Sequence, residues 1–257
     1  MSAVLVRRDG GIVTVSVNNP ARLNCLGTAQ IVAFIEAVTA LADDPELRAL
    51  IVTGEGGRAF MGGADLLELG ELDPQRAREF LTLIHRMCKA LRNLPVPVIA
   101  RVNGYCLGAG REVMAACDLH IASDDAVFGM SEVRIGLPSV VEAALLPQLI
   151  GWGRTKLLLY TGDTIDARTA QEWGLVEKVV PAADLDAAIA AWTRSIVESG
   201  PKAIRLQKEL IREWEAMPVG DAIEAGIRCI VRAYETGEPT RMVGEAIRRL
   251  KARKTTE

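Results

Sequence analysis

The feature that most constrains the fold is a repeated alternation of short apolar runs with longer amphipathic stretches. Leu47–Thr53 and Val96–Val102 are apolar runs bounded by proline or glycine, which is typical of strands buried on both faces. Between them, Asp73-Pro74 supplies a capping residue and a proline at the first helical position, followed by apolar residues at helical spacing. Strand, helix and strand in this order predict an α/β fold with crossover connections.

The last part of the chain has a different character. After Pro181 the pattern indicates helices alone. We expect a boundary near residue 200, with a main domain over residues 1–199 and a helical region over residues 200–257. Amphipathic helices with so little sheet to cover are expected to pack on the main body or on another subunit rather than to fold alone.

Composition excludes several classes of protein. The 257 residues are 49% hydrophobic and 25% charged, and no window approaches the unbroken apolar length of a membrane span, so we expect a soluble protein without membrane partners. The N-terminal segment MSAVLVRRDGG lacks the pattern of a secretory signal, and cytoplasm is the expected location. A net charge of −3 without a basic stripe argues against nucleic acid as a partner.

The cysteines and histidines do not form the pattern of a metal site or of a Ser-His-Asp or Cys-His hydrolase. The five cysteines form no CxxC pair, and their odd count argues against a disulfide framework and against a zinc site. We expect reduced, buried thiols. His85 and His120 have no serine or cysteine nucleophile in a sharp turn nearby, and GxSxG is absent, which disfavours a Ser-His-Asp or Cys-His hydrolase and metal ligation.

A glycine-rich turn, GYCLGAG over residues 104–110, joins a predicted strand to a predicted helix. Glycines allow close approach of a ligand to the backbone, and free N–H groups at a helix start stabilise an oxygen that gains negative charge. The spacing is not that of a dinucleotide-binding GxGxxG. Gly62-Gly63-Ala64-Asp65 is a similar turn, and the two could each direct one N–H at the same carbonyl oxygen. A purely structural connection is the alternative in both cases.

Glu112 and Glu132 are the candidate acid and base. Glu112 lies in the first turn of an otherwise apolar helix, where poor solvation raises a carboxyl pKa toward the range useful for proton transfer. Glu132 follows twenty residues later, after Phe128-Gly129-Met130-Ser131. The alternatives are a helix N-terminal acid favoured by the helix dipole and a solvated loop charge.

Several motifs, in this order, make the chain resemble a known family: AFMGGADLLEL, VPVIARVNGYCLGAGREVMAACDLHIA, FGMSEVRIGLP and LLLYTGDTIDARTAQEWGLVEKVVP. They resemble the enoyl-CoA hydratase/isomerase, or crotonase, superfamily over nearly the whole chain. NNPARLNCL is similar to the family's early CoA-contacting segment, and TRMVGEAIRRLKARK to its C-terminal helix. The resemblance implies a spiral core of ββα turns and C-terminal helices that build homo-oligomers, trimers or dimers of trimers.

The resemblance also implies an acyl-CoA thioester as substrate. By motif position, the backbone N–H groups of Ala64 and Ala109 would hold the thioester oxygen, and Glu112 and Glu132 match the two glutamates of the hydratases. No cofactor is expected, because CoA enters as part of the substrate. The full set expected to contact substrate or CoA is Arg22, Leu23, Gly62, Ala64, Asp65, Leu66, Leu67, Gly108 and Ala109.

The reaction expected from the resemblance is that of a hydro-lyase in fatty acid β-oxidation. Water would add at Cβ of a 2-enoyl-CoA to give a 3-hydroxyacyl-CoA, with Glu112 orienting and deprotonating the water and Glu132 supplying the proton at Cα. An enoyl-CoA isomerase, or a hydrolase or lyase acting on an acyl-CoA, is the alternative within the superfamily. A non-catalytic acyl-CoA-binding protein is a third reading, and the paired glutamates argue against it.

Departures from the family pattern concern three candidate acyl-pocket residues, Arg111, Leu137 and Glu142. If Arg111 points inward, its charge is expected to depress the pKa of Glu112. The segment IGLPSVVEAALLPQLIG replaces the usual glycine-rich PGAGG run and introduces Glu142. We expect Glu142 to be a helix-surface acid. The alternative places it near the acyl pocket, where it would favour isomerisation or thioester hydrolysis.

Overall fold

The computed structural model describes residues 2–254. Met1, at the start of the first predicted domain, and residues 255–257, at the end of the second, lie outside the described residues. The chain divides into two compact units, Met1–Thr193 and Arg194–Glu257. This division falls slightly before the boundary near residue 200 expected from the sequence. Each unit is described by itself.

The first unit contains a six-stranded sheet of order β1-β2-β3-β5-β7-β10. Its strands are β1 (Val4–Asp9), β2 (Ile12–Val17), β3 (Ala49–Gly54), β5 (Val98–Val102), β7 (Leu119–Ser123) and β10 (Lys178–Val180). β1 and β2 form an antiparallel hairpin, and from β2 onward all neighbours are parallel. Every residue of β3 is buried, as predicted for a strand covered on both faces.

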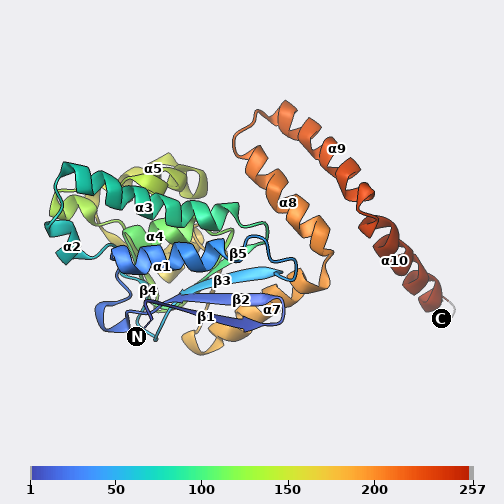
Figure 1. Cartoon of the computed structure of the whole chain (residues 1–257), viewed down its shortest axis with the longest axis horizontal. Coiled ribbons are helices and arrows are strands. Elements are labelled where there is room, and N and C mark those ends of the chain that lie inside the picture. Colours follow the sequence, from blue (N-terminus) through green and yellow to red (C-terminus); the bar gives the residue numbers. More distant parts are fainter. Residues whose placement is uncertain (1, 255–257) are drawn as a thin grey trace. The chain divides into compact units, whose positions relative to one another are not determined.

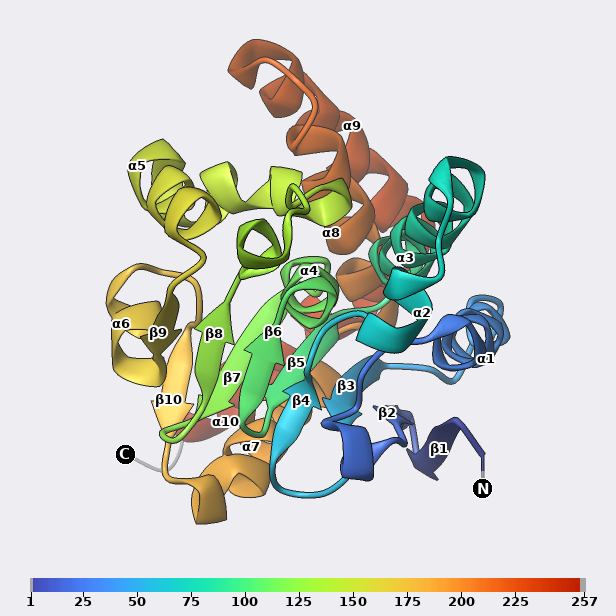
Figure 2. The same cartoon turned by 90° about the vertical axis from the view of Figure 1, so that its left-hand side faces the viewer.

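A second sheet of four strands has the order β4-β6-β8-β9. It is formed by β4 (Ala59–Met61), β6 (Tyr105–Leu107), β8 (Val127–Gly129) and β9 (Thr164–Asp166), and only β8 and β9 pair antiparallel. Along the chain β3 is followed by β4, β5 by β6 and β7 by β8, each pair then leading to a helix (Figure 2). Each turn of this ββα spiral therefore adds one strand to each sheet.

Helices cover the sheets of the first unit. They are α1 (Thr28–Thr39), α2 (Leu66–Gly70), α3 (Pro74–Asn93), α4 (Ala109–Ala115), α5 (Leu146–Thr161), α6 (Ala167–Glu172) and α7 (Leu185–Glu198), with short 3-10 helices η1 (Pro20–Arg22), η2 (Glu132–Ile135), η3 (Val141–Leu145) and η4 (Ala182–Asp184). α1 and α3 lie side by side (Figure 1). The Asp73 side chain caps α3 by accepting from the Arg76 N–H at 2.9 Å, and the apolar face predicted from sequence is buried.

The second unit is helical: after the last residues of α7 it contains α8 (Pro201–Trp214), α9 (Val219–Glu235) and α10 (Glu238–Lys254). The Arg232 guanidinium on α9 donates to both carboxylate oxygens of Glu209 on α8, at 3.0 and 2.8 Å. At the start of α8, the N–H groups of Lys202 and Ala203 donate to the Glu238 carboxylate at 3.3 and 2.8 Å. These contacts join the three helices within the unit.

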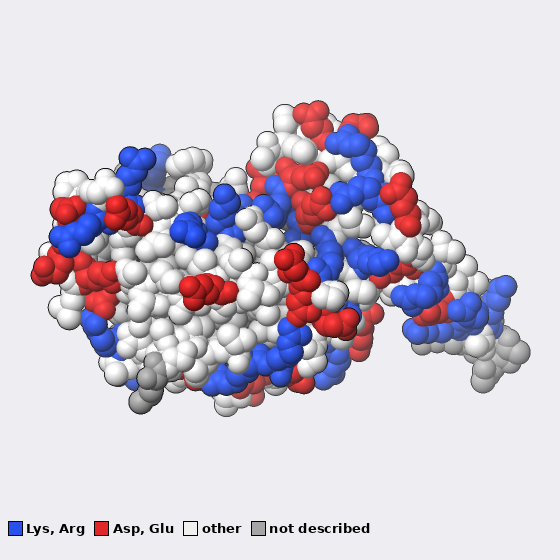
Figure 3. Space-filling view, in the orientation of Figure 1, with Lys and Arg blue, Asp and Glu red and all other residues white. Residues whose placement is uncertain are grey.

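The surface drawn in Figure 3 carries Lys and Arg interspersed with Asp and Glu. In the part of the chain that the structure describes, no helix is long and apolar enough to cross a membrane.

Candidate active site

The turn between β6 and α4 presents one backbone N–H at a helix start. Gly108 is the N-cap of α4 with φ 49°, and its N–H donates to the Gly129 carbonyl at 3.0 Å, which ties the turn to β8. Ala109 is the first helical residue, so its N–H has no acceptor inside the helix. A Cβ on Gly108 would lie 2.8 Å from Glu132 Oε1, so any other residue here would displace this carboxylate.

A second turn, Gly62–Asp65, lies against the first. The N–H groups of Gly62 and Asp65 donate to the carbonyls of Leu23 and Leu26 at 2.8 and 2.9 Å. Within residues 2–254, the N–H of Ala64 between them donates to no acceptor in the protein. A Cβ on Gly108 would lie 3.8 Å from the Gly63 Cα, so the two turns are in contact. The unpaired N–H groups of Ala64 and Ala109 are therefore in the same part of the structure.

Glu112 is held in α4 away from solvent, with 4% of its surface exposed. The pKa of Glu112 is raised from 4.5 to about 8, mainly by burial and then by the charges of Glu132 and Glu142, while the Ala143 N–H acts in the opposite direction. A carboxyl whose pKa lies near the operating pH can both accept and release a proton. The poor solvation predicted from the sequence is therefore confirmed.

Glu132 begins η2 and is half-buried. Its Oε1 is the oxygen next to Gly108, and its Oε2 accepts from the Ser139 hydroxyl at 2.9 Å. Sequence reasoning missed Ser139. The only signal for it was its place in the segment that departs from the family pattern.

Glu142 is buried, with 6% of its surface exposed, so the expectation of a helix-surface acid was wrong. It lies in η3, and its Oε1 is 2.8 Å from His85 Nδ1 on α3. The preceding residue, Val141, has φ 40°, a left-handed conformation that is strained for a β-branched side chain. The segment that departs from the family pattern thus forms a tight 3-10 turn that holds Glu142 inside. The sequence indicated no catalytic or metal-binding role for His85, and it gave no sign that Glu142 is its partner.

Arg111 is completely buried, yet the expected effect on Glu112 was wrong. The pKa of Glu112 is raised rather than depressed, because desolvation and two carboxylates act on it. The charge of Arg111 interacts instead with Cys106 and Glu132, and burial lowers the pKa of Arg111 to about 10. Among the described residues, Nε, Nη1 and Nη2 of Arg111 have no hydrogen-bond partner. Leu137, the third candidate acyl-pocket residue, is 40% exposed in the loop after η2.

The residues expected to contact CoA are held by a short network. Arg22 pairs with both oxygens of Asp65 at 2.7 and 2.6 Å, and Asp65 caps α2 by accepting from the Leu67 N–H at 2.9 Å. Leu66 and Leu67 are 63% and 73% exposed. An apolar pair held outward on a capped helix is a surface that a ligand could cover.

Asn24 supports this loop and was missed by sequence reasoning. Its side-chain amide donates to the carbonyls of Glu55 and Ala59 at 3.0 and 2.9 Å, and its oxygen accepts from the Asn19 N–H at 2.9 Å. It is fully buried with φ 56°, a conformation that asparagine tolerates. Asn24 lies in the NNPARLNCL segment, which resembles the family's CoA-contacting segment, but nothing in the sequence distinguished it from the other residues of that segment.

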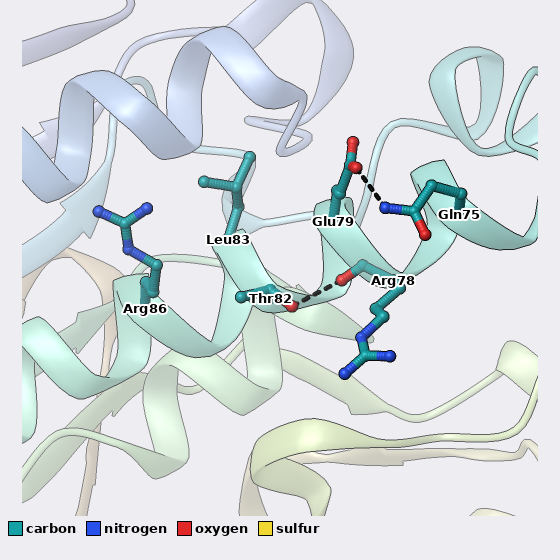
Figure 4. Close-up of a pocket in the computed structure, with 6 residues that line it drawn as sticks. All are labelled: Gln75, Arg78, Glu79, Thr82, Leu83 and Arg86. Atoms are coloured by element: carbon teal, nitrogen blue, oxygen red, sulfur yellow. Dashed lines mark hydrogen bonds between the residues drawn. The ribbon is translucent and has the colours of Figure 1, made fainter.

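A hollow of about 360 Å³ lies elsewhere, on the outer side of α3 (Figure 4). All of its lining residues come from α3: Gln75, Arg78, Glu79, Thr82, Leu83 and Arg86. It includes none of the predicted site residues.

The family model for Enoyl-CoA hydratase/isomerase matches residues 7–235. The chain therefore belongs to the enoyl-CoA hydratase/isomerase family and is an enzyme, which confirms the resemblance predicted from its motifs. Its α/β architecture of ββα turns with C-terminal helices is likewise confirmed as the crotonase fold.

Individual relatives and a solved structure are similar to this chain over most of its length. Crotonyl-CoA hydratase of Syntrophomonas wolfei is 36% identical over 211 residues, 82% of this chain and 81% of that protein. Short-chain-enoyl-CoA hydratase of Clostridium acetobutylicum is 34% identical over 212 residues, covering 82% and 81%. The crystal structure of enoyl-CoA hydratase from Bacillus anthracis matches with a TM-score of 0.91 at 31% identity, covering 97% of this chain and 96% of that one.

Proposed function

We propose that the protein is a 2-enoyl-CoA hydratase, which adds water to its substrate to give a 3-hydroxyacyl-CoA. The observation that carries the proposal is the contact between two glycine turns, each with an unpaired N–H. Glu132 lies beside the Gly108 turn, and Glu112 lies on α4, the helix that this turn begins. Relatives whose names specify crotonyl-CoA and short-chain enoyl-CoA hydration support a short acyl chain.

In this proposal the thioester oxygen accepts hydrogen bonds from the N–H groups of Ala64 and Ala109. Polarisation of the carbonyl makes Cβ electrophilic and stabilises the enolate that forms as water adds. Donors already in place and shielded from water contribute on the order of 3–4 kcal/mol each to such an oxyanion. The hydrogen bonds that fix Gly62, Gly108 and Asp65 hold both donors before substrate arrives.

Glu112 deprotonates the water and Glu132 supplies the proton at Cα. The raised pKa of Glu112, about 8, keeps the water's proton transfer reversible near neutral pH. The charge of Glu132 contributes to the raised pKa of Glu112, so the two carboxyls are coupled through space. Ser139 orients Glu132 through the bond to its Oε2.

The substrate's CoA would lie along the Arg22–Asp65 pair and the exposed Leu66 and Leu67. No metal or redox cofactor enters the proposed reaction, because electrophilic activation comes from backbone N–H groups and proton transfer from carboxyls. Cytoplasmic location and a place in β-oxidation stay predictions of the sequence.

We also propose a homo-oligomer, a trimer or a dimer of trimers, assembled through the second unit. α9 leaves a run of apolar side chains exposed, at 54–60%: Ile223, Ile227, Ile230, Val231 and Tyr234. An apolar stripe of this length on one helix is typical of a surface covered by a partner. Light scattering measures the assembly, and a monomer at micromolar concentration would contradict it.

Loss of the conjugated-enoyl absorbance of crotonyl-CoA tests the activity. Glu112→Gln and Glu132→Gln should each lower the rate by at least about 10², since each removes one proton-transfer group. Circular dichroism of both variants controls for folding. If both retain wild-type rates, the assigned roles are wrong.

The buried Glu142 favours a second candidate, an isomerase or thioester hydrolase of the same family, because a third carboxyl offers a further proton acceptor. Mass spectrometry of products from a panel of acyl-CoA thioesters separates the reactions. Hydration adds the mass of one water, isomerisation leaves the mass unchanged, and hydrolysis releases free CoA.

A further inference from the structure

One pair of titratable side chains has no role in the reaction as described. His85 Nδ1 on α3 lies 2.8 Å from Glu142 Oε1 on η3. The Glu142 side chain is 7% exposed and the His85 side chain 51% exposed, so the pair runs from the interior to the surface. Within the described residues, the other oxygen of Glu142, Oε2, is buried without a hydrogen-bond partner.

The proposed hydration leaves Glu112 and Glu132 in protonation states that differ from those at the start. An O–H bond of water breaks, its oxygen bonds to Cβ, and its proton goes to Glu112. The O–H bond of protonated Glu132 breaks and a C–H bond forms at Cα. The product has gained one water, while Glu112 now holds a proton and Glu132 has lost one. Before the next cycle Glu112 must release a proton and Glu132 must take one up from solvent.

We propose that Glu142 and His85 form a proton relay that carries the proton from Glu112 to solvent after each turnover; the inference rests on the proposed hydratase function. Glu142 receives the proton from Glu112, directly or through one water, and passes it from Oε1 to the Nδ1 of neutral His85. The imidazole then releases the proton on Nε2 to solvent. Each step breaks one O–H or N–H bond and forms another, so the charges return to their starting values. His85 is then left with its proton on Nδ1, and exchange of its ring protons with solvent restores the Nε2–H form that can accept the next proton.

Burial explains why Glu112 needs such a route. With 4% of its surface exposed, Glu112 has little direct access to bulk water. η3, which carries Glu142, packs against both α4, which carries Glu112, and α3, which carries Cys88. The charge of Glu142 accordingly raises the pKa values of Glu112 and Cys88. Cys88 lies one helical turn after His85 on α3, and burial raises the pKa of its thiol well above the ordinary range, so it stays protonated.

Titratable groups on α3, α4 and η2 act on the relay or on Glu112. α3 contributes His85 and Cys88, α4 contributes Glu112, and Glu132 on η2 acts on Glu112. His85 is the member of this set that joins Glu142 to the exposed surface. An imidazole suits this position because it has two nitrogens, one that can accept a proton from Glu142 and one that can release a proton to solvent.

The test compares the full-length enzyme with His85→Ala, His85→Gln and Glu142→Gln in crotonyl-CoA hydration at low buffer concentration. Lys89→Ala is the matched control, since it removes an exposed side chain one turn along the same helix. For both His85 variants kcat should fall by at least about tenfold, with KM within about twofold of wild type. Added imidazole should restore the kcat of His85→Ala in a saturable manner and leave wild type and Lys89→Ala unchanged.

Glutamine at position 85 keeps a hydrogen-bond donor for Glu142 but cannot pass a proton, so it separates a relay from a structural contact. A His85→Gln enzyme with wild-type kcat would overturn the relay, as would a loss in His85→Ala that imidazole does not restore. Glu142→Gln should lose activity that imidazole does not recover, because the break lies inside the protein. A wild-type enzyme that turns over no enoyl-CoA would refute the proposed function itself, which is a distinct result.

Discussion

Replacement of Glu112 by glutamine should stabilise the folded protein, and the gain should grow as the pH rises. The folded-state pKa of Glu112, about 8, lies above its ordinary value of 4.5, so the folded chain holds this proton more tightly than the unfolded chain. Below the ordinary value both states are protonated and the carboxyl costs nothing. As the pH rises from there, the unfolded chain ionises first, and the penalty on folding grows until the folded pKa is passed.

The size of the penalty follows from the same values. A rise from 4.5 to about 8 corresponds to about 5 kcal/mol once both states are ionised, and to about 3 kcal/mol at pH 7. Solvent screening reduces this free-energy penalty only slightly, because only 4% of the surface of Glu112 is exposed. Glutamine has nearly the same shape and carries no charge, so the variant lacks this pH-dependent cost.

Urea unfolding of wild type and Glu112→Gln at several pH values between 5 and 9 measures the effect. Protein concentration is held constant, since assembly would otherwise change the apparent stability. We expect the difference in unfolding free energy to increase by about 2–3 kcal/mol between pH 5 and pH 7. Glu36→Gln, at an exposed position on α1, is the control and should show no such trend. A difference that stays constant across this range would refute the reasoning.

Three further substitutions test the site. Glu142→Gln removes a charge that raises the pKa of Glu112, so the rise of kcat/KM with pH should move to lower pH; an unmoved profile would contradict the coupling. Gly108→Ala should lower turnover by at least about 10², because its methyl group would lie 2.8 Å from Glu132 Oε1 and displace this carboxylate. Gly10→Ala, with φ 55° and nothing within 4 Å, should cost about 1 kcal/mol of stability and no activity. Arg111→Leu should raise the unfolding free energy by about 1–4 kcal/mol, because it removes a buried guanidinium without a partner; a lower melting temperature would show that the charge is needed.

Local pattern was sufficient for much of the fold. The apolar runs that became β3 and β5, the capped helix α3 and the helical character after Pro181 depend on residues close together in sequence. Side-chain period, caps and turns act over a few residues, so they can be recognised without knowledge of the tertiary fold. The glycine turns were found in the same way, since glycine at a strand-to-helix turn is a local requirement.

Which charged side chains are buried was decided only by the tertiary structure. The sequence by itself determined the family, the spiral of ββα turns and the two glutamates on which the proposed chemistry rests. It placed Glu142 on a helix surface and left His85 without a partner, because these residues are 57 positions apart and meet only through the packing of α3 on η3. The direction of the pKa of Glu112 likewise required the positions of all three carboxyls, since desolvation and charge depend on distance in space and not on separation along the chain.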